Sequence, residues 1–350
     1  MKLINTIYLI AACAMSTTAT SQNIPEKTSN SAPARTMRFG IGLGEDHPQG
    51  MAVKRFAEIV ADKTQGRIRI ELFAGGKLGN DQSMTDALAA GKLEMTAPDT
   101  SSLVRFTKGF GVINFPFLLG SEVDADNLLD SSFGKELLAT LPAHKLVGLG
   151  YWENGFRNLT NSRAPVSRKA DFVDLKVRVM PNAMFSDTFS SLGSTPVKLP
   201  FPEVYANLKD RTVQAQENPL ITIYSSKFYE VQPYLTLSRH AYSAWVIMIG
   251  QPAWASLSAA EQQIFQAAAT ESTQYERGLI RAKNAQMVEE LKKLGMKVSE
   301  IDRNDLPIIR MTTRKVIDKY AKEFGEDWIK KMYIQLAANE HRKMLTNSVK

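Results

Sequence analysis

The chain has 350 residues, of which 44% are hydrophobic and 23% are charged. This profile is typical of a globular protein with two or three domains, and it excludes a largely disordered or fibrous chain. The net charge of +7 comes from 43 basic and 36 acidic residues spread along the chain. Because no basic stripe forms, we expect no nucleic-acid partner, whereas the mild positive excess suits an anionic small molecule.

Cysteine and histidine are too sparse for a structural metal site. The single cysteine, Cys13, excludes a disulfide framework and a cysteine metal site. The four histidines lack the spacing of zinc ligands; they are His47, His144, His240 and His341.

The N-terminus has the pattern of an export signal. Lys2 precedes a short apolar run, Leu3–Met15, and small polar residues follow it. This pattern predicts a signal peptide over residues 1–21, and the run is too short to span a bilayer. A flexible linker is expected over residues 22–36. The protein is therefore expected in the periplasm.

A lipoprotein signal is the alternative for the same segment. Ile10-Ala11-Ala12-Cys13 resembles a bacterial lipoprotein box, in which the cysteine becomes the lipidated first residue. The signal would then cover residues 1–12, and Cys13 would anchor the protein to a membrane outside the cytoplasm.

The first part of the chain alternates predicted strands and helices. Pro48 suits the first turn of a helix, Asp81 can cap the next helix, and Gly91 fits its C′ position. The elements are a strand at Arg38–Leu43, a helix from Pro48, a strand at Ile68–Leu72, a helix from Asp81 to Ala90 and a strand at Leu93–Ala97. This order predicts a parallel, doubly wound sheet that binds ligands at the carboxyl ends of its strands.

The glycine run Gly40-Ile41-Gly42-Leu43-Gly44 does not predict a nucleotide site. Glu45 occupies the position at which the dinucleotide fingerprint needs a glycine for close helix packing. The sequence also lacks a P-loop, a Gly-x-Ser-x-Gly elbow and a His-Glu-x-x-His motif. We therefore expect no cofactor and no enzymatic activity.

A second α/β unit follows. Ala244–Ile249 is apolar throughout, which favours a central strand. The other predicted elements are strands at Leu146–Gly150, Val177–Met180, Val197–Leu199 and Thr212–Gln216, and helices at Asn182–Leu192 and around Phe201–Leu208.

A long helix is predicted after this unit. Ser258 and Glu261 form a capping box, and only Gly278 interrupts the helical pattern before Gly295. At ~1.5 Å per residue, such a helix would be ~54 Å long. Because the apolar positions do not sustain heptads, we favour a helix across two lobes over two helices broken at Gly278 or a coiled-coil arm. Two further helices are expected around Pro307–Phe324 and Asp327–Ala338.

Several spaced motifs resemble the extracytoplasmic solute receptors of TRAP transporters, the tripartite ATP-independent periplasmic systems for organic acids. The resemblance covers nearly all of Met37–Ala338. The motifs lie at Lys77–Asp81, Gly150–Thr160, Asp174–Met180, Leu199–Tyr205, Gln216–Pro219 and Lys227–Gln232.

The resemblance implies a two-lobed, periplasmic-binding-protein-like α/β fold, with a cleft that closes on the ligand and a long helix that spans both lobes. We expect lobe I at residues 37–154 plus 244–283, and lobe II at residues 155–243 plus 284–345. The resemblance also implies a pair of membrane permease subunits that move the solute with an ion gradient. We expect the receptor to be a monomer.

The resemblance also assigns ligand-binding residues. Arg178 matches the main carboxylate clamp, and its guanidinium can present two parallel donors to a carboxylate. Arg157 matches a second basic position that meets the same anion or a hydroxyl. Asn218 matches a polar amide, and Phe201 matches an aromatic wall for the carbon skeleton of the ligand.

The ligand class stays open at this stage. Gly42 stands where sialic-acid receptors carry an asparagine, and Asp99 lacks the arginine that accompanies it there, which disfavours a nine-carbon sugar acid. Asp99 and Glu153 could accept hydrogen bonds from the hydroxyls of a uronate or aldonate. Trp152, with Tyr151, resembles the corresponding pair in C4-dicarboxylate receptors.

The sequence therefore predicts a receptor that binds an organic acid anion, a C4-dicarboxylate or a sugar acid such as a uronate, and delivers it to a TRAP permease. The alternative is a periplasmic sensor that presents the same ligand to a membrane signalling protein.

Overall fold

The computed structural model describes residues 35–347, and side chains as far as residue 338. The predicted signal peptide, the lipidation site at Cys13 and residues 22–34 of the predicted linker lie outside the described residues. The linker prediction runs two residues too far, because the first strand begins at Arg35, where it pairs with Ile68. The described residues belong to one compact unit, so the lobe boundaries stay a prediction.

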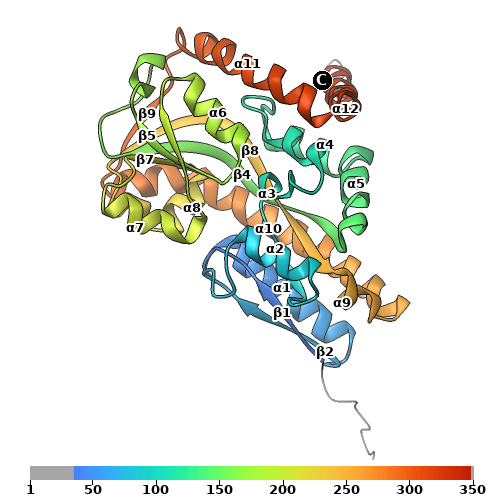
Figure 1. The fold of residues 1–350 in the computed structure, drawn as a ribbon. Coiled ribbons are helices and arrows are strands. Elements are labelled where there is room, and N and C mark those ends of the chain that lie inside the picture. The colour runs from blue at the N-terminus through green and yellow to red at the C-terminus, as the bar shows by residue number, and fades with distance from the viewer. Residues whose placement is uncertain (1–34, 348–350) are drawn as a thin grey trace, which may run out of the picture. The chain divides into compact units, whose positions relative to one another are not determined.

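Within the described residues, nine strands form a single mixed sheet (Figure 1). Its order is β2-β1-β3-β8-β4-β7-β5-β6, and β9 pairs with β8. The strands are β1 (Arg35–Gly40), β2 (Ile68–Phe73), β3 (Met95–Thr96), β4 (Leu146–Asn161), β5 (Lys176–Val179), β6 (Thr195–Lys198), β7 (Ala215–Asn218), β8 (Tyr234–Gly250) and β9 (Lys297–Glu300).

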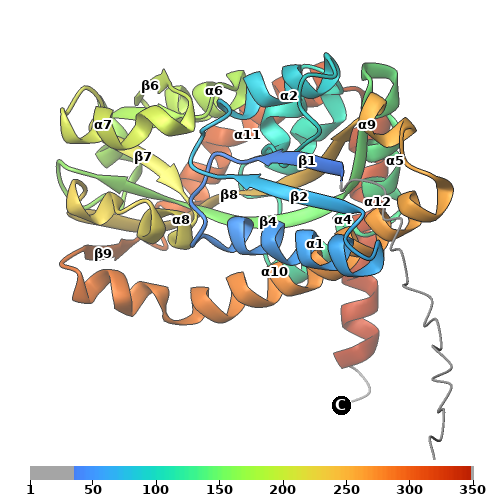
Figure 2. The ribbon, with the colours of Figure 1, turned by 90° about the horizontal axis from the view of Figure 1, so that it is seen from below.

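Helices cover both faces of this sheet. Figure 2 shows α1 and α10 on one side and α2, α6 and α11 on the other. The described helices are α1 (Pro48–Lys63), α2 (Asp81–Ala89), α3 (Thr100–Leu103), α4 (Glu122–Leu129), α5 (Ser132–Ala139), α6 (Ala183–Ser191), α7 (Val204–Lys209), α8 (Leu220–Ser225), α9 (Gln251–Ala255), α10 (Ala259–Lys293), α11 (Leu306–Phe324) and α12 (Glu326–Asn347). No described helix is long and apolar enough to cross a membrane.

Two long antiparallel strands, β4 and β8, form the centre of the sheet and join its two halves. On one side lie the parallel strands β1, β2 and β3, and on the other lie the parallel strands β5, β6 and β7. The predicted two-lobed α/β fold is therefore confirmed, and Ala244–Ile249 lies in the central strand β8. The parallel sheet predicted for the first unit is confirmed, because β1 runs parallel to both β2 and β3. The prediction did not include the antiparallel centre, where β8 runs antiparallel to both β3 and β4.

The prediction also missed most of β4, which has 16 residues and continues far beyond Gly150. The missed part is rich in buried polar side chains, including Asn154, Arg157 and Asn158. Such residues give no apolar alternation, which is the usual signal of a strand. Register shifts between Glu153 and Gly155, and between Arg157 and Leu159, also interrupt the regular alternation of side chains along this strand.

The start of α2 differs from the prediction. Asn80, not Asp81, is the N-cap: its side chain accepts a hydrogen bond of 3.0 Å from the backbone N–H of Ser83, and a capping box with Ser83 is present. Asp81 is the first helical residue. Its carboxylate is therefore available for a contact elsewhere, which proves to be in the cavity described below.

Helix α10 is a single helix of 35 residues that begins with the predicted capping box at Ser258 and continues through Gly278. It packs against α1, β4 and α8, which belong to different parts of the chain (Figure 2). The lobe-spanning helix is thus confirmed, and the broken-helix and coiled-coil alternatives were wrong.

Gly278→Ala is expected to increase the free energy of unfolding by about 0.5–1 kcal/mol, because alanine loses less conformational entropy than glycine in a helix interior. A Cβ at Gly278 would meet no atom within 4 Å. Urea denaturation of the two proteins measures the difference. The matched control is Gly134→Ala in α5, where a Cβ would stand 1.9 Å from the carbonyl oxygen of Leu129 and should destabilise the fold. A destabilised Gly278→Ala variant would contradict this reading of α10.

Candidate ligand-binding site

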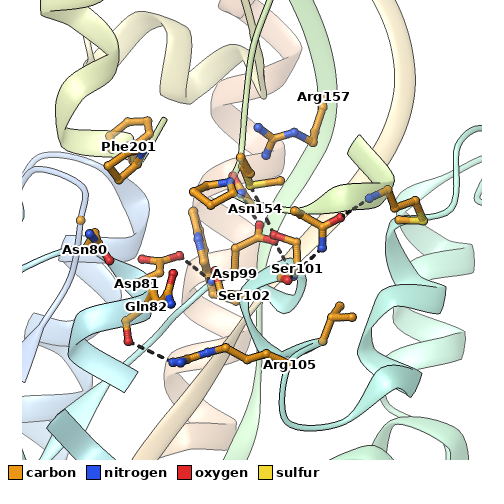
Figure 3. A pocket seen from close by; sticks show the side chains of 18 of the residues that line it. Asn80, Asp81, Gln82, Asp99, Ser101, Ser102, Arg105, Asn154, Arg157 and Phe201 are labelled. Carbon is orange, nitrogen blue, oxygen red and sulfur yellow. Dashed lines mark hydrogen bonds between the residues drawn. The ribbon is translucent and has the colours of Figure 1, made fainter. Parts of the chain in front are cut away.

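A cavity of about 280 Å³ lies where strand ends and helix starts meet (Figure 3). It is lined by the start of α2, the start of α3, one face of β4, the ends of β5 and β7, and the start of α6. Of the residues predicted from the sequence, the cavity wall contains Arg178, Arg157, Asn218, Phe201 and Asp99.

Arg178 is the third of the four residues of β5, close to the carboxyl end of the strand. Its neighbours Val177 and Val179 belong to a buried apolar cluster, while the arginine lines the cavity. The Nε and Nη2 atoms donate hydrogen bonds of 2.9 and 2.7 Å to the carbonyl oxygen of Leu199. The buried Nη1 atom has no partner among the described residues.

Burial lowers the pKa of Arg178 to about 10, and the nearby positive charge of Arg157 contributes to the shift. At neutral pH the guanidinium is still charged, but it lies in a site that penalises that charge. An anion in the cavity would both pair with the free Nη1–H and offset this penalty.

Arg157 extends from β4 into the same wall, but its charge is already paired. Its Nε and Nη2 atoms donate to the carboxylate of Glu217 on β7, the latter at 2.9 Å, and Nη2 also donates to Oδ1 of Asn218 at 3.1 Å. Nη1 donates to Oγ of Ser243 at 3.2 Å. The buried Arg157–Glu217 pair therefore positions Asn218 at the cavity.

Glu217 is fully buried between Arg157 and His240. Burial alone would raise the pKa of this carboxyl, but the charge of Arg157 and the hydrogen bonds from His240 and Arg157 lower it to about 2. Sequence reasoning did not single out Glu217, although it lies in the Gln216–Pro219 motif beside Asn218.

Asn218 and Phe201 complete this side of the cavity. The Nδ2 atom of Asn218 donates to Oε1 of Gln216 at 2.6 Å, so both ends of the amide have partners in the protein. Phe201 begins the 3₁₀ helix Phe201–Glu203, and its ring lies 6.2 Å from that of Phe228. The ring can contact the carbon skeleton of a ligand.

Two carboxyl groups, Asp81 and Asp99, also line the cavity (Figure 3). Asp99 caps α3: its Oδ1 accepts from the N–H of Ser101 at 2.9 Å, and its Oδ2 accepts from Nδ2 of Asn154 at 3.1 Å. The backbone N–H of Asp99 donates to Oδ2 of Asp81 at 2.9 Å. Burial, reinforced by the charge of Asp99, raises the pKa of Asp81 to about 6.

Two amide oxygens in the cavity wall lack hydrogen-bond partners. Gln49 donates through Nε2 to the carbonyl oxygen of Ala97 at 2.9 Å, but its buried Oε1 has no partner among the described residues. Asn154 donates to Asp99, and its buried Oδ1 likewise has none. Both can accept hydrogen bonds from ligand hydroxyls. The sequence analysis missed Gln49, Asn154 and Asp81, because only the fold brings them to this wall.

The structure does not bring Glu153 and Trp152 to the cavity. Adjacent side chains of a strand face opposite sides, so Asn154 faces the cavity while Glu153 faces α10. There its Oε2 accepts from Nε and Nη2 of Arg281 at 2.9 and 2.6 Å. Trp152 lies in the core, with its ring stacked 5.9 Å from that of Phe39.

The fold and its cavity define a two-lobed receptor for a small solute. The family model described as bacterial extracellular solute-binding protein, family 7, matches residues 39–323. The chain belongs to this family, which supplies the solute receptors of TRAP transporters, so the resemblance found in the sequence is confirmed. The family consists of extracytoplasmic binding proteins.

Individual relatives agree with this placement. The 2,3-diketo-L-gulonate-binding periplasmic protein YiaO of Escherichia coli (strain K12) is 34% identical and covers 79% of this chain and 84% of its own. The C4-dicarboxylate-binding protein DctB of Bacillus subtilis (strain 168) is 30% identical over 84% of this chain and 85% of its own. The sugar acid binding protein DctPAm from Advenella mimigardefordensis strain DPN7T, solved in complex with galactonate, matches with a TM-score of 0.85 and 37% identity over 87% of this chain and 99% of that chain.

Proposed function

We propose that this receptor binds a sugar acid with a single carboxylate in the cavity and delivers it to the membrane subunits of a TRAP permease. Membership of a transport receptor family supports delivery to a permease and a location in the periplasm. Lipid anchoring through Cys13 and the monomeric state stay predictions. No observation favours the sensor alternative.

The proposal depends on one observation, which is that the guanidinium of Arg178 forms no ion pair with a protein carboxylate. The cavity wall contains four cationic side chains, Arg105, Lys108, Arg157 and Arg178. Three of them are paired with protein carboxylates, those of Asp86, Glu323 and Glu217 respectively. Among the described residues, Arg178 alone in this wall has no carboxylate partner, and its Nη1–H is unpaired. One unpaired guanidinium matches one ligand carboxylate.

The part of the cavity wall around Asp81 and Asp99 favours hydroxyl groups over a second carboxylate. Asp99 forms no ion pair with any described cation, so a second ligand carboxylate beside it would meet a like charge in a partly desolvated site. The oxygens of Gln49 and Asn154 need hydrogen-bond donors, and ligand hydroxyls supply them. Succinate, the simplest saturated C4-dicarboxylate, has a second anionic end and no hydroxyl groups.

Galactonate is therefore expected to bind at least tenfold more tightly than succinate, which corresponds to about 1.4 kcal/mol. Isothermal titration calorimetry with each acid measures both affinities. A thermal-shift panel that includes 2,3-diketo-L-gulonate tests other sugar acids as ligands. Mass spectrometry of any co-purified molecule can identify the bound acid directly. Equal or tighter binding of succinate would contradict the proposed ligand class, while leaving the receptor family unaffected.

A further inference from the structure

Asp81 has a free oxygen in the cavity wall. Its Oδ2 is held by the backbone N–H of Asp99, whereas its Oδ1 receives no hydrogen bond from the described residues. Oδ1 lies 3.8 Å from the point where a Cβ on Gly42 would stand, an ordinary van der Waals separation, so Gly42 leaves space beside this oxygen. Figure 3 shows the Asp81 and Asp99 carboxyl groups on the same side of the cavity.

The neighbouring carboxyl groups of Asp81 and Asp99 differ in the number of N–H groups that donate hydrogen bonds to them. Asp99 receives two N–H donors, from Ser101 and Asn154. Asp81 receives one. The charged groups that act on Asp81 are Asp99, from the loop after β3, and Arg178, from β5; neither forms an ion pair with it. A half-buried carboxyl beside a second carboxylate favours its neutral form.

A bound anion makes the group of charges formed by Asp81, Asp99 and Arg178 more negative. In the free cavity, the charge of Arg178 interacts with the carboxyl groups of Asp81 and Asp99 without forming an ion pair with either. An anionic ligand adds a negative charge and takes the free Nη1–H of Arg178 as its partner. Three negative groups would then share one unpaired cation. Transfer of a proton from solvent to one carboxylate removes part of this excess negative charge, as it does in coupled carboxyl pairs generally.

We propose that Asp81 takes up a proton from solvent when the ligand binds, and that its neutral carboxyl group then donates a hydrogen bond from Oδ1 to an oxygen of the ligand. This inference rests on the proposed function, because it needs an anionic, oxygen-rich ligand in the cavity. It makes Asp81 a specificity-determining residue that acts as a donor, and it couples binding to pH.

The sign of the pH dependence follows from linkage. The pKa of Asp81 in the free protein is about 6, so the group is mostly ionised at pH 7.5. The anion raises that pKa further, so binding takes up a proton at pH values between the free and bound pKa values. Affinity should therefore be constant well below pH 6 and fall by up to about tenfold per pH unit above it.

Proton uptake is measured directly by titrating the full protein with galactonate in buffers of different ionisation enthalpy, phosphate and Tris, at pH 7.5 and matched ionic strength. The wild type is expected to take up about 0.5–1 proton per bound galactonate. Binding whose enthalpy is independent of the buffer would overturn the inference but not the proposed function. Failure to bind galactonate or the other sugar acids would overturn both.

Asp81→Asn tests whether residue 81 donates a hydrogen bond to the ligand, because the asparagine amide is neutral and can donate, whereas an ionised carboxylate can only accept. This variant is expected to bind galactonate within about threefold of the wild type at pH 6, with no proton uptake and a flat pH profile. The matched control, Asp62→Asn at an exposed position of α1, should keep the uptake of the wild type. Loss of binding in Asp81→Asn, or uptake that persists in it, contradicts the inference.

Discussion

Arg178→Ala is expected to weaken the binding of galactonate by ~30- to 4,000-fold, which corresponds to ~2–5 kcal/mol. The ligand carboxylate would lose the one cation in the described cavity wall that forms no ion pair with a protein carboxylate. A desolvated carboxylate without a charged donor is costly, so most of the affinity should disappear.

Arg178→Lys is expected to recover only part of this loss. The guanidinium keeps Nε and Nη2 on the carbonyl oxygen of Leu199 while Nη1 stays free, an arrangement that a single ammonium cannot reproduce. Calorimetry measures the affinities, and circular dichroism confirms the folded state.

Arg105→Ala provides a matched control for Arg178→Ala. Arg105 lines the same cavity, but its guanidinium is partly exposed and already pairs with Asp86 at 2.6 Å. Its removal should change the affinity much less than removal of Arg178. If Arg178→Ala binds galactonate within about threefold of the wild type, the assignment of the anion-binding residue is wrong.

Glu217→Gln is expected to reduce the free energy of unfolding by about 3–5 kcal/mol, because removal of one charge from a buried pair leaves the other uncompensated. Arg157 and Glu217 are both fully buried, and Arg157 has no other carboxylate partner among the described residues. Urea denaturation at pH 7 measures the loss.

The pH dependence of stability gives a second readout for Glu217. The folded protein lowers the pKa of this carboxyl from 4.5 to about 2. A lowered pKa stabilises the fold fully above the unfolded value of 4.5, and this contribution is lost as the pH falls from there toward 2. Between pH 5 and 3, the stability of Glu217→Gln should therefore fall less steeply than that of the wild type.

The control for Glu217→Gln is Asp318→Asn. Asp318 forms an exposed ion pair with Arg314 at 2.9 Å, on the surface of α11. Exposed pairs of this kind contribute about 0.3–0.5 kcal/mol. A cost for Glu217→Gln as small as that of Asp318→Asn would show that the buried pair is not needed for the fold.

Local sequence patterns determined the elements whose signals lie within a few residues of one another. The capping box at Ser258 and the unbroken helical pattern after it predicted α10 correctly. The valines on either side of Arg178 placed its side chain opposite the apolar cluster, near the end of a strand. The spaced motifs identified the family, because a family resemblance sums many weak local matches.

Tertiary structure alone decided which polar groups meet. The sequence analysis placed Glu153 at the ligand and missed Asn154, but the strand directs Asn154 to Asp99 and Glu153 to Arg281. Arg157 appears free in the sequence and finds Glu217 only when β4 pairs with β7. These pairings depend on strand register and on chain segments far apart in the sequence. No local pattern encodes them, and they determine which charges the fold leaves for a ligand.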